Sequence, residues 1–189
     1  DKVAIDAAAY FRDQRDGFGR NLFTGAENHK SRDVSVRSKM LIEPTDATRI
    51  TLGADYSKMS GTIMAHRTGD VNGNPPAGMG YWDNASDINE SLYGKNFGGS
   101  VRLEHDFDGV KLTSISALRW SHQMQNGDLD LTTQPLVQYP LFERNKQFTQ
   151  EINLSGDTER LTWIVGAFYL DGVSKNAPFR LLGLGVGAN

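Results

Sequence analysis

The chain has 189 residues, enough for one domain with a sizeable core, together with a formal net charge of −3, a hydrophobic content of 38% and no cysteine. The small net charge and the lack of a basic run exclude nucleic acid as a partner, and the lack of cysteine excludes disulfides, thiolate metal sites and cysteine nucleophiles. No run of about 18 apolar residues is present, which excludes a transmembrane helix but not a transmembrane β-barrel, because a barrel needs only alternating segments of ~10 residues.

Three hairpins with short turns are predicted from stretches in which apolar and polar residues alternate. The paired strands are residues 34–43 with 49–56, 101–107 with 110–120, and 148–155 with 161–170. The middle turn is Asp108-Gly109, a dipeptide that is a strong short-range signal for a hairpin. With one earlier strand ahead of them, we expect about seven antiparallel strands.

Long polar stretches separate the hairpins, at residues 13–33, 57–99 and 121–146. Structureless loops beyond ~12–15 residues are uncommon in compact domains unless they are functional. Here they alternate strictly with short turns, and short turns at one end with long loops at the other are typical of an outer-membrane barrel. The predicted fold is therefore all-β, an antiparallel up-and-down meander that forms a segment of a transmembrane β-barrel.

Alternation also assigns side chains to faces. Three charged residues share one face of the strand at 101–107, namely Arg102, Glu104 and Asp106. Such charges suit water or a wet barrel lumen, because unpaired charge in an apolar core costs several kcal/mol. A soluble antiparallel sheet with one solvated face would show the same alternation, so the pattern alone leaves both readings open. The asymmetry of the loops favours the barrel.

Trp163 and Tyr169 share one face of the strand at 161–170, six residues apart. At ~3.3 Å per residue they are separated by roughly 20 Å, close to the ~25 Å height of the apolar band that aromatic girdles flank in a barrel. We therefore predict that both are membrane-interface aromatics. On the partner strand, Glu151 and Asn153 are predicted to face the lumen.

Residues 147–172, QFTQEINLSGDTERLTWIVGAFYLDG, resemble a barrel hairpin of the TonB-dependent outer-membrane receptors. DGFGRNLFTG at 16–25 and RSKMLIEPTDATRITLGADYS at 37–57 are similar to earlier segments of the same family, in the same order. The positions that carry the hairpin resemblance are Phe148, Glu151, Leu161, Trp163, Gly166, Phe168 and Tyr169.

The resemblance implies a receptor in the bacterial outer membrane, with lipid around it, that imports a scarce nutrient such as an iron–siderophore complex. It also implies ligand capture by outer loops and displacement of a plug by the TonB energy-coupling complex. Family barrels of this kind close with about 22 strands and carry the plug ahead of the barrel. We therefore expect residues 1–189 to be a partial barrel, one piece of a longer chain that lacks the plug.

Four aromatic residues are the candidates for ligand contact in the outer loop predicted at 57–99: Tyr81, Trp82, Tyr93 and Phe97. The alternatives are that they pack the loop against itself or ring the membrane interface. Asp70 opens a calcium-like motif, but Pro75 and Tyr81 replace its required glycine and glutamate, so no metal is predicted. No catalytic constellation or cofactor motif is present, and we do not expect an enzyme.

Two other functions fit the same strand pattern. A small complete outer-membrane barrel of ~8 strands, with a structural or adhesive role, would need no plug. A soluble β-sandwich that serves as a binding module would also alternate, with its connections mixed at both ends.

Overall fold

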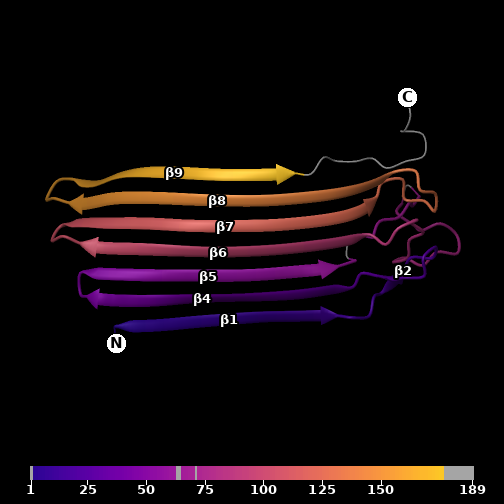
Figure 1. The fold of residues 1–189 in the computed structure, drawn as a ribbon, viewed down its shortest axis with the longest axis horizontal. Helices are drawn as coiled ribbons and strands as arrows, with labels where there is room; N and C mark the ends of the chain where they lie inside the picture. The colour runs from indigo at the N-terminus through magenta and orange to yellow at the C-terminus, as the bar shows by residue number, and fades with distance from the viewer. Residues whose placement is uncertain (1, 63–64, 71, 177–189) are drawn as a thin grey trace, which may run out of the picture.

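The computed structural model describes residues 2–62, 65–70 and 72–176, which form one seven-stranded antiparallel sheet and a small two-stranded one (Figure 1). The strands of the large sheet are β1 (Val3–Gln14), β4 (Ser31–Thr45), β5 (Thr48–Gly61), β6 (Ser91–Asp106), β7 (Val110–Asp128), β8 (Gln138–Asp157) and β9 (Thr162–Asn176). Each strand is hydrogen-bonded to the next one of the series. The predicted all-β, antiparallel up-and-down meander is confirmed.

Short turns and long loops lie at opposite ends of the sheet, the turns on the left and the loops on the right of Figure 1. The loops are residues 15–30, 62–90 and 129–137, and the first of them contains β2 (Gly19–Arg20) and β3 (Glu27–Asn28). The loops expected at 57–99 and 121–146 were too long. Polar residues there continue the strand ladder beyond the apolar stretch, because backbone pairing does not require apolar side chains.

The register divides the side chains of the large sheet between two faces of opposite character. The apolar face carries, one from each strand in order, Ile5, Met40, Leu52, Val101, Leu118, Ile152 and Val165. The polar face carries Asp6, Lys39, Asp55, Arg102, Arg119 and Glu151. This division is the one that period-two alternation predicts.

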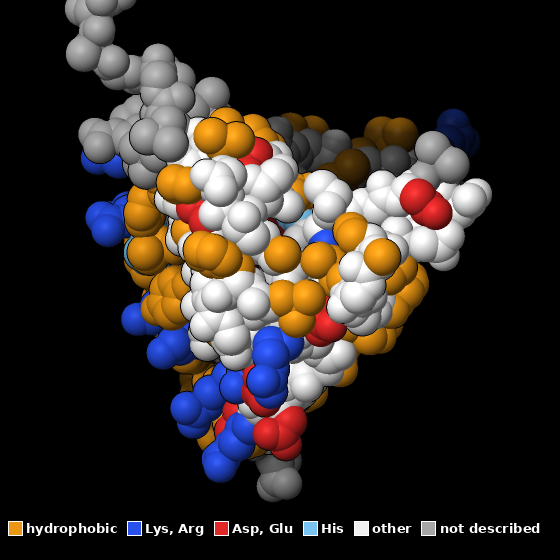
Figure 2. Space-filling view, turned by 90° about the vertical axis from the view of Figure 1, so that its right-hand side faces the viewer, with side chains coloured by type: hydrophobic (Ala, Val, Ile, Leu, Met, Phe, Trp, Pro, Cys, Tyr) orange, Lys and Arg blue, Asp and Glu red, His pale blue; other side chains and the backbone are white. Residues whose placement is uncertain are grey.

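No second layer covers the apolar face. None of the hydrophobic residues in the described part of the chain is buried, and Ile5 is 63% and Val165 66% exposed. Figure 2, which looks onto the loop end, shows hydrophobic side chains at the surface. The sizeable core expected from chain length is therefore absent from the described residues, because their apolar side chains are collected on one face of a single sheet. For the same reason these residues do not form a two-sheet sandwich.

Among the described residues, none forms an apolar helix that could cross a membrane.

Ion pairs between strands lie on the polar face. Arg12 meets Asp33 at 2.9 Å, and Lys111 of β7 meets Glu104 of β6 at 2.6 Å. Arg102 also lies 3.1 Å from Glu104, so two of the three charges predicted to share a face in this region contact each other. Each exposed pair contributes only about 0–1 kcal/mol, but together they show which face is built for polar surroundings.

The edge strand β9 departs from this division. Val165 and Tyr169 lie on the apolar face as expected, but Ile164, Phe168 and Leu170 lie on the polar face and are more than half exposed. Both faces of β9 are therefore apolar near its middle. Among the described residues, no other element covers Ile164, Phe168 and Leu170 on the polar face.

Candidate ligand-binding site in the long loops

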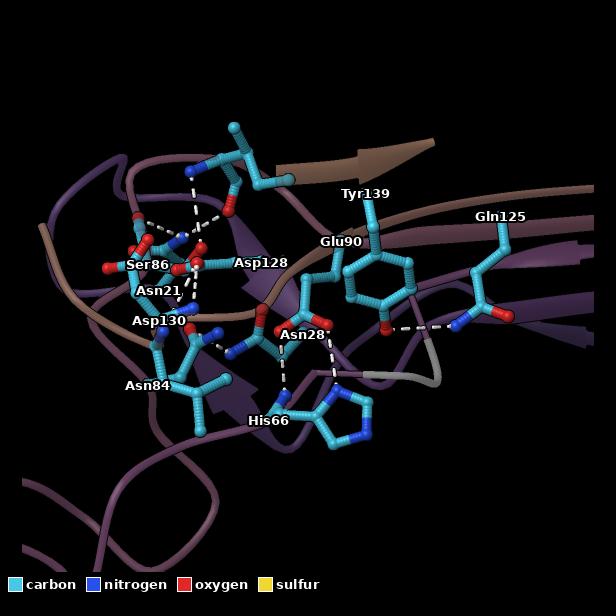
Figure 3. Close-up of polar contacts among 12 residues, drawn as sticks. Asn21, Asn28, His66, Asn84, Ser86, Glu90, Gln125, Asp128, Asp130 and Tyr139 are labelled. Atoms are coloured by element: carbon cyan, nitrogen blue, oxygen red, sulfur yellow. Dashed lines mark hydrogen bonds and ion pairs between the residues drawn. The ribbon is translucent and has the colours of Figure 1, made fainter. Parts of the chain in front are cut away.

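The loops at 15–30 and 62–90 are joined by Asn21, whose side chain is completely buried. Its amide nitrogen donates to the carbonyl oxygens of Ser86 and Ile88, both at 2.9 Å, and its amide oxygen accepts from the N–H of Phe23 at 3.0 Å. Figure 3 shows Asn21 among the other polar side chains of this region. One side chain thus satisfies backbone groups of two loops, as buried polar groups require.

A second amide pair strengthens the same junction. Asn28 Nδ2 donates to Asn84 Oδ1 at 2.9 Å, and both residues are buried. The backbone of Asn84 accepts from Leu22 N–H at 2.8 Å and donates to Arg20 O at 3.1 Å. A network in which the members satisfy one another rigidifies the structure around it.

The third loop joins through Asp87. Its N–H donates to Thr132 O at 3.0 Å, and its carboxylate accepts from Gln138 Nε2 at 2.6 Å. Asp128, at the end of β7, accepts from the N–H groups of Asp130 and Leu131 and so shapes the start of the loop at 129–137. The three long loops therefore form one connected structure at the end of the sheet.

His66 and Glu90 form a further contact within the loop at 62–90 (Figure 3). Glu90 is buried, and its carboxylate lies 2.8 Å from both the backbone N–H and Nδ1 of His66. Burial raises the pKa of Glu90, and the hydrogen bonds from His66 oppose that rise without cancelling it. The contact fixes the path of the chain just before β6 begins.

An open cleft of about 410 Å³ lies between these loops. Its lining includes His29, Arg67, Asp70, Tyr81, Trp82 and Asp83. Trp82 packs edge-on against His29 with ring centroids 5.6 Å apart and against Tyr81 at 4.9 Å. The Arg67 guanidinium lies 5.2 Å from the centre of the Tyr81 ring. Aromatic faces beside one cation and two carboxylates can hold a flat or ring-bearing ligand.

The cleft depends on close backbone approach. A Cβ atom on Gly19 would lie 1.9 Å from the carbonyl oxygen of Trp82, so glycine is needed there. Asp83 accepts from Arg20 N–H at 2.8 Å and from Gly80 N–H at 3.0 Å. These bonds place Trp82 over β2 without using its indole nitrogen.

The chain matches no protein-family model, no curated protein and no solved structure.

Two of the four predicted ligand-contact aromatics line the cleft and two do not. Tyr81 and Trp82 line it and are 63% and 51% exposed. The expectation that Tyr93 and Phe97 share their loop is wrong, because β6 begins at Ser91 and both residues lie in it, on the apolar face. Ligand contact by Tyr81 and Trp82 stays a prediction.

Trp163 and Tyr169 lie on the apolar face of β9, opposite Gly156 and Gln150. The Trp163 ring covers Gly156, where an added Cβ would approach the ring to 2.8 Å. Their position at a membrane interface stays a prediction.

Sequence reasoning missed His29 and Arg67. His29 is in the left-handed region with φ 58°, and Phe18 stacks on it with ring centroids 4.8 Å apart. No local motif marks either residue as part of a site. Only the pairing of β2 with β3 and the junction of the loops bring them to Trp82.

In the calcium-like stretch, the carboxylate of Asp70 accepts hydrogen bonds from its own loop. Asp70 accepts from the N–H groups of Asn72 at 2.8 Å and Asn74 at 2.9 Å, and from the Asn74 side chain at 2.9 Å. The hydrogen bonds from the Asn74 side chain and backbone lower the pKa of Asp70. Val71 of this stretch lies outside the described residues. Within the ranges that the structure describes, no group of three or more His, Asp or Glu could hold a metal ion.

Proposed function

We propose that this chain forms part of the wall of a transmembrane β-barrel in a bacterial outer membrane, in a receptor of the TonB-dependent kind that takes up a scarce nutrient such as an iron–siderophore complex. The observation that carries the membrane part of this proposal is an oblique line of aromatic side chains across the apolar face. We call this line the aromatic belt, and its members are Phe11, Tyr56, Phe97, Trp120, Phe148 and Tyr169.

The slope of the aromatic belt follows from the strand register. A line drawn straight across the strands from Phe11 passes through Val34, Lys58, Lys95, His122 and Arg144 and reaches β9 at Lys175. The belt residue of β9 is Tyr169, which is 175 − 169 = 6 residues nearer the turns. The belt therefore shifts by six residues over the six steps from β1 to β9, a mean of one residue per strand. The shift is not uniform: Tyr56, Phe97 and Trp120 lie directly opposite one another, and two-residue shifts occur on either side of them. No aromatic residue of β4 takes part.

That slope corresponds to the tilt of strands in a membrane barrel. One residue of ~3.3 Å along the strand for each ~4.8 Å between strands gives a tilt of ~35°. Strands of outer-membrane barrels tilt by ~35–45° relative to the barrel axis, and aromatic girdles lie level with the membrane interface. A soluble sheet has no reason to align aromatics along such a line, since water meets its exposed face everywhere.

The height of the apolar band agrees with the same geometry. On β7 it runs from Val110 to Trp120, ten residues or ~33 Å along the strand at ~3.3 Å per residue. A tilt of ~35–45° reduces this length to ~25 Å, the height of the lipid-facing band in outer-membrane barrels. The open edges at β1 and β9 fit a wall that further strands complete, because unpaired backbone groups are not tolerated in lipid.

The receptor part of the proposal is supported by the sequence resemblance and by the connected loops with their aromatic cleft. A nutrient captured at Tyr81 and Trp82 would pass inward along the polar face. Energy for uptake would come from the TonB complex acting on a plug region outside these residues.

The most direct test of the proposal is which end of the strands faces outside the cell. The chain has no cysteine, so single cysteines placed at Trp82 and at Asp157 can be labelled on intact cells with a membrane-impermeant thiol reagent. We expect labelling at position 82, in the loop end, and none at position 157, in the turn end, until the outer membrane is broken. Labelling at 157 but not at 82 in intact cells would reject the proposed orientation.

A further inference from the structure

Five neighbouring strands carry a basic residue where their apolar run ends on the loop side of the apolar face. We call this set the basic margin, and its members are Arg32, Lys58, Lys95, His122 and Lys146. Four of them lie two positions nearer the loops than the belt residue of the same strand, so the margin runs parallel to the aromatic belt. Figure 2 shows Lys and Arg side chains along one side of the sheet, beside hydrophobic ones.

The basic margin brings like charges together. Lys58 lies directly opposite Lys95. Like charges at directly opposed positions destabilise a sheet unless an anion lies between them. The arrangement therefore points to a negatively charged partner.

Carboxylates of the described chain do not supply that charge. Among the described residues no ion pair joins Lys58, Lys95 or Lys146 to an acidic side chain, whereas five cations on the polar face are paired with carboxylates, namely Arg12, Arg49, Arg102, Lys111 and Arg119. Two acidic residues of the apolar face lie in the edge strands, Asp13 of β1, which is opposite Arg32, and Asp171 of β9. The third, Asp128, is at the loop end of β7, where its carboxylate accepts from backbone N–H groups of the loop. The Lys95 ammonium instead lies over two rings, 5.7 Å from the centre of Tyr56 and 5.9 Å from the centre of Trp120.

The margin exists on one side of the apolar band only. On the turn side, this face ends at Thr48, His105 and Trp163, without lysine or arginine. Lysine and arginine are long enough to hold an apolar stem against lipid while the charge reaches the headgroups. A one-sided margin therefore selects the leaflet next to the long loops.

A groove on the apolar face leads up to the margin. It has a volume of about 440 Å³ and is lined by Ala7, Ala9, Val36, Ala54, Tyr56 and Phe97 among others. Its floor is a row of small residues, because Ala7 lies opposite Ser38 and Ser38 opposite Ala54. Lys58 and Lys95 are each two positions nearer the loops than Tyr56 and Phe97, so groove and cations adjoin.

From this juxtaposition we infer that the basic margin binds the phosphate group of an anionic lipid in the leaflet beside the loops, with an acyl chain of that lipid in the groove. The inference rests on the proposed function, since it needs the apolar face to meet lipid. Phosphate oxygens accept from ammonium groups of two neighbouring strands at once, and that relieves the repulsion between Lys58 and Lys95.

The test uses the full-length protein that carries this chain, purified in detergent and titrated with phosphatidic acid while native mass spectrometry counts bound lipids. K58Q/K95Q removes two margin cations far from Asp13 and Asp171. K39Q/R102Q is the matched control, because it removes two cations from the polar face and leaves Lys111 paired with Glu104. We expect phosphatidic acid to bind about 25-fold more weakly to K58Q/K95Q, since each basic residue near an anionic surface contributes a factor of about five. The control is expected to bind like the wild type.

The inference is overturned if phosphatidylcholine binds as tightly as phosphatidic acid, or if K39Q/R102Q loses as much affinity as K58Q/K95Q. It is also overturned if inorganic phosphate binds as tightly as phosphatidic acid without lipid, because the margin would then be a plain anion site. Retention of the protein in membranes washed with alkaline carbonate is measured in parallel. If the protein is retained but shows no preference for phosphatidic acid, the lipid site is refuted and the proposed barrel wall is not contradicted. A protein that washes off refutes the proposed function and the lipid site together.

Discussion

Arg119 of β7 and Asp55 of β5 form an ion pair across the strand that separates them, with Arg119 Nη1 2.7 Å from both carboxylate oxygens. The residue between them is Gly98 of β6, which is the register partner of both. A Cβ atom on Gly98 would lie 2.2 Å from Nη1 and 2.8 Å from the Asp55 carboxylate. Glycine at this position therefore leaves the path that the arginine side chain needs to link three strands on the polar face.

Gly98→Ala is expected to break this pair and lower the thermal midpoint of the folded protein in detergent. The pair itself, being exposed, contributes about 0–1 kcal/mol, and the clash adds to its loss. Gly99→Ala is the matched control, because its Cβ would point to the apolar face and meet nothing nearer than 3.9 Å. Circular dichroism on heating measures both variants, and an equal loss in the two would contradict the argument.

The three tryptophans of the chain, Trp82, Trp120 and Trp163, can test which parts of the chain meet lipid under the proposed function. Trp120 and Trp163 lie on the apolar face, whereas Trp82 lines the loop cleft. In variants that keep one tryptophan each, lipids brominated on the acyl chain should quench the fluorescence of Trp120 and Trp163 strongly and that of Trp82 little. Stronger quenching of Trp82 than of the other two would be incompatible with the proposed membrane boundary.

Trp82 and Tyr93 are expected to differ in ligand uptake although both were candidates from the sequence. Trp82→Ala removes an aromatic wall of the cleft. Under the proposed function, cells that depend on this protein for iron should need roughly tenfold more iron for equal growth, since ring–ring stacking contributes ~1 kcal/mol or more per contact and ~1.4 kcal/mol corresponds to a factor of ten. Tyr93→Ala changes the apolar face of β6 and should leave uptake near wild type at equal protein level.

Growth in medium with a titrated iron chelator measures this difference, and immunoblotting of membranes controls for protein amount. Equal uptake in wild type and Trp82→Ala would remove the cleft from the proposed function. It would not contradict the proposed barrel wall.

Two loop carboxylates should respond to pH in opposite directions. Burial raises the pKa of Glu90 above its ordinary value of 4.5, so its contribution to loop stability is fully present below pH 4.5 and is lost as pH rises through the raised value. Hydrogen bonds from Asn74 lower the pKa of Asp70 below 3.8, so its contribution is present above pH 3.8 and is lost as pH falls through the lowered value.

Amide hydrogen exchange followed by NMR can read both sites. The N–H of His66, bonded to Glu90, should become less protected as pH rises through the raised pKa, after correction for intrinsic exchange, and the E90Q variant should lose this dependence. The N–H groups of Asn72 and Asn74 should lose protection only in acid, and D70N should abolish that change. The same direction of change at both sites would contradict the assignment.

Local chemistry determined the strands and turns of this protein. Alternation over residues 101–107 and the Asp108-Gly109 turn predicted the hairpin of β6 and β7, and φ at Asp108 is 63° and at Gly109 100°. Period-two alternation and turn residues act within a few positions, so one sequence suffices to read them. The same local pattern assigned Arg102 and Glu104 to one face.

Strand ends and sites depended on contacts that are distant along the chain. Polar residues at 121–128 continue β7 because β8 pairs with them, and nothing local distinguishes them from a loop. His29 and Trp82 meet only because backbone junctions hold two loops together.

The sequence by itself determined that the chain is a meander of alternating strands, because each strand and turn is encoded in its own residues. The tertiary structure alone decided how far each strand is offset from the next. That offset turns Phe11, Tyr56 and Tyr169 from scattered aromatics into one oblique belt, and sets Lys58 beside Lys95. Register is a relation between strands, fixed by pairing over long separations, and no single strand contains it.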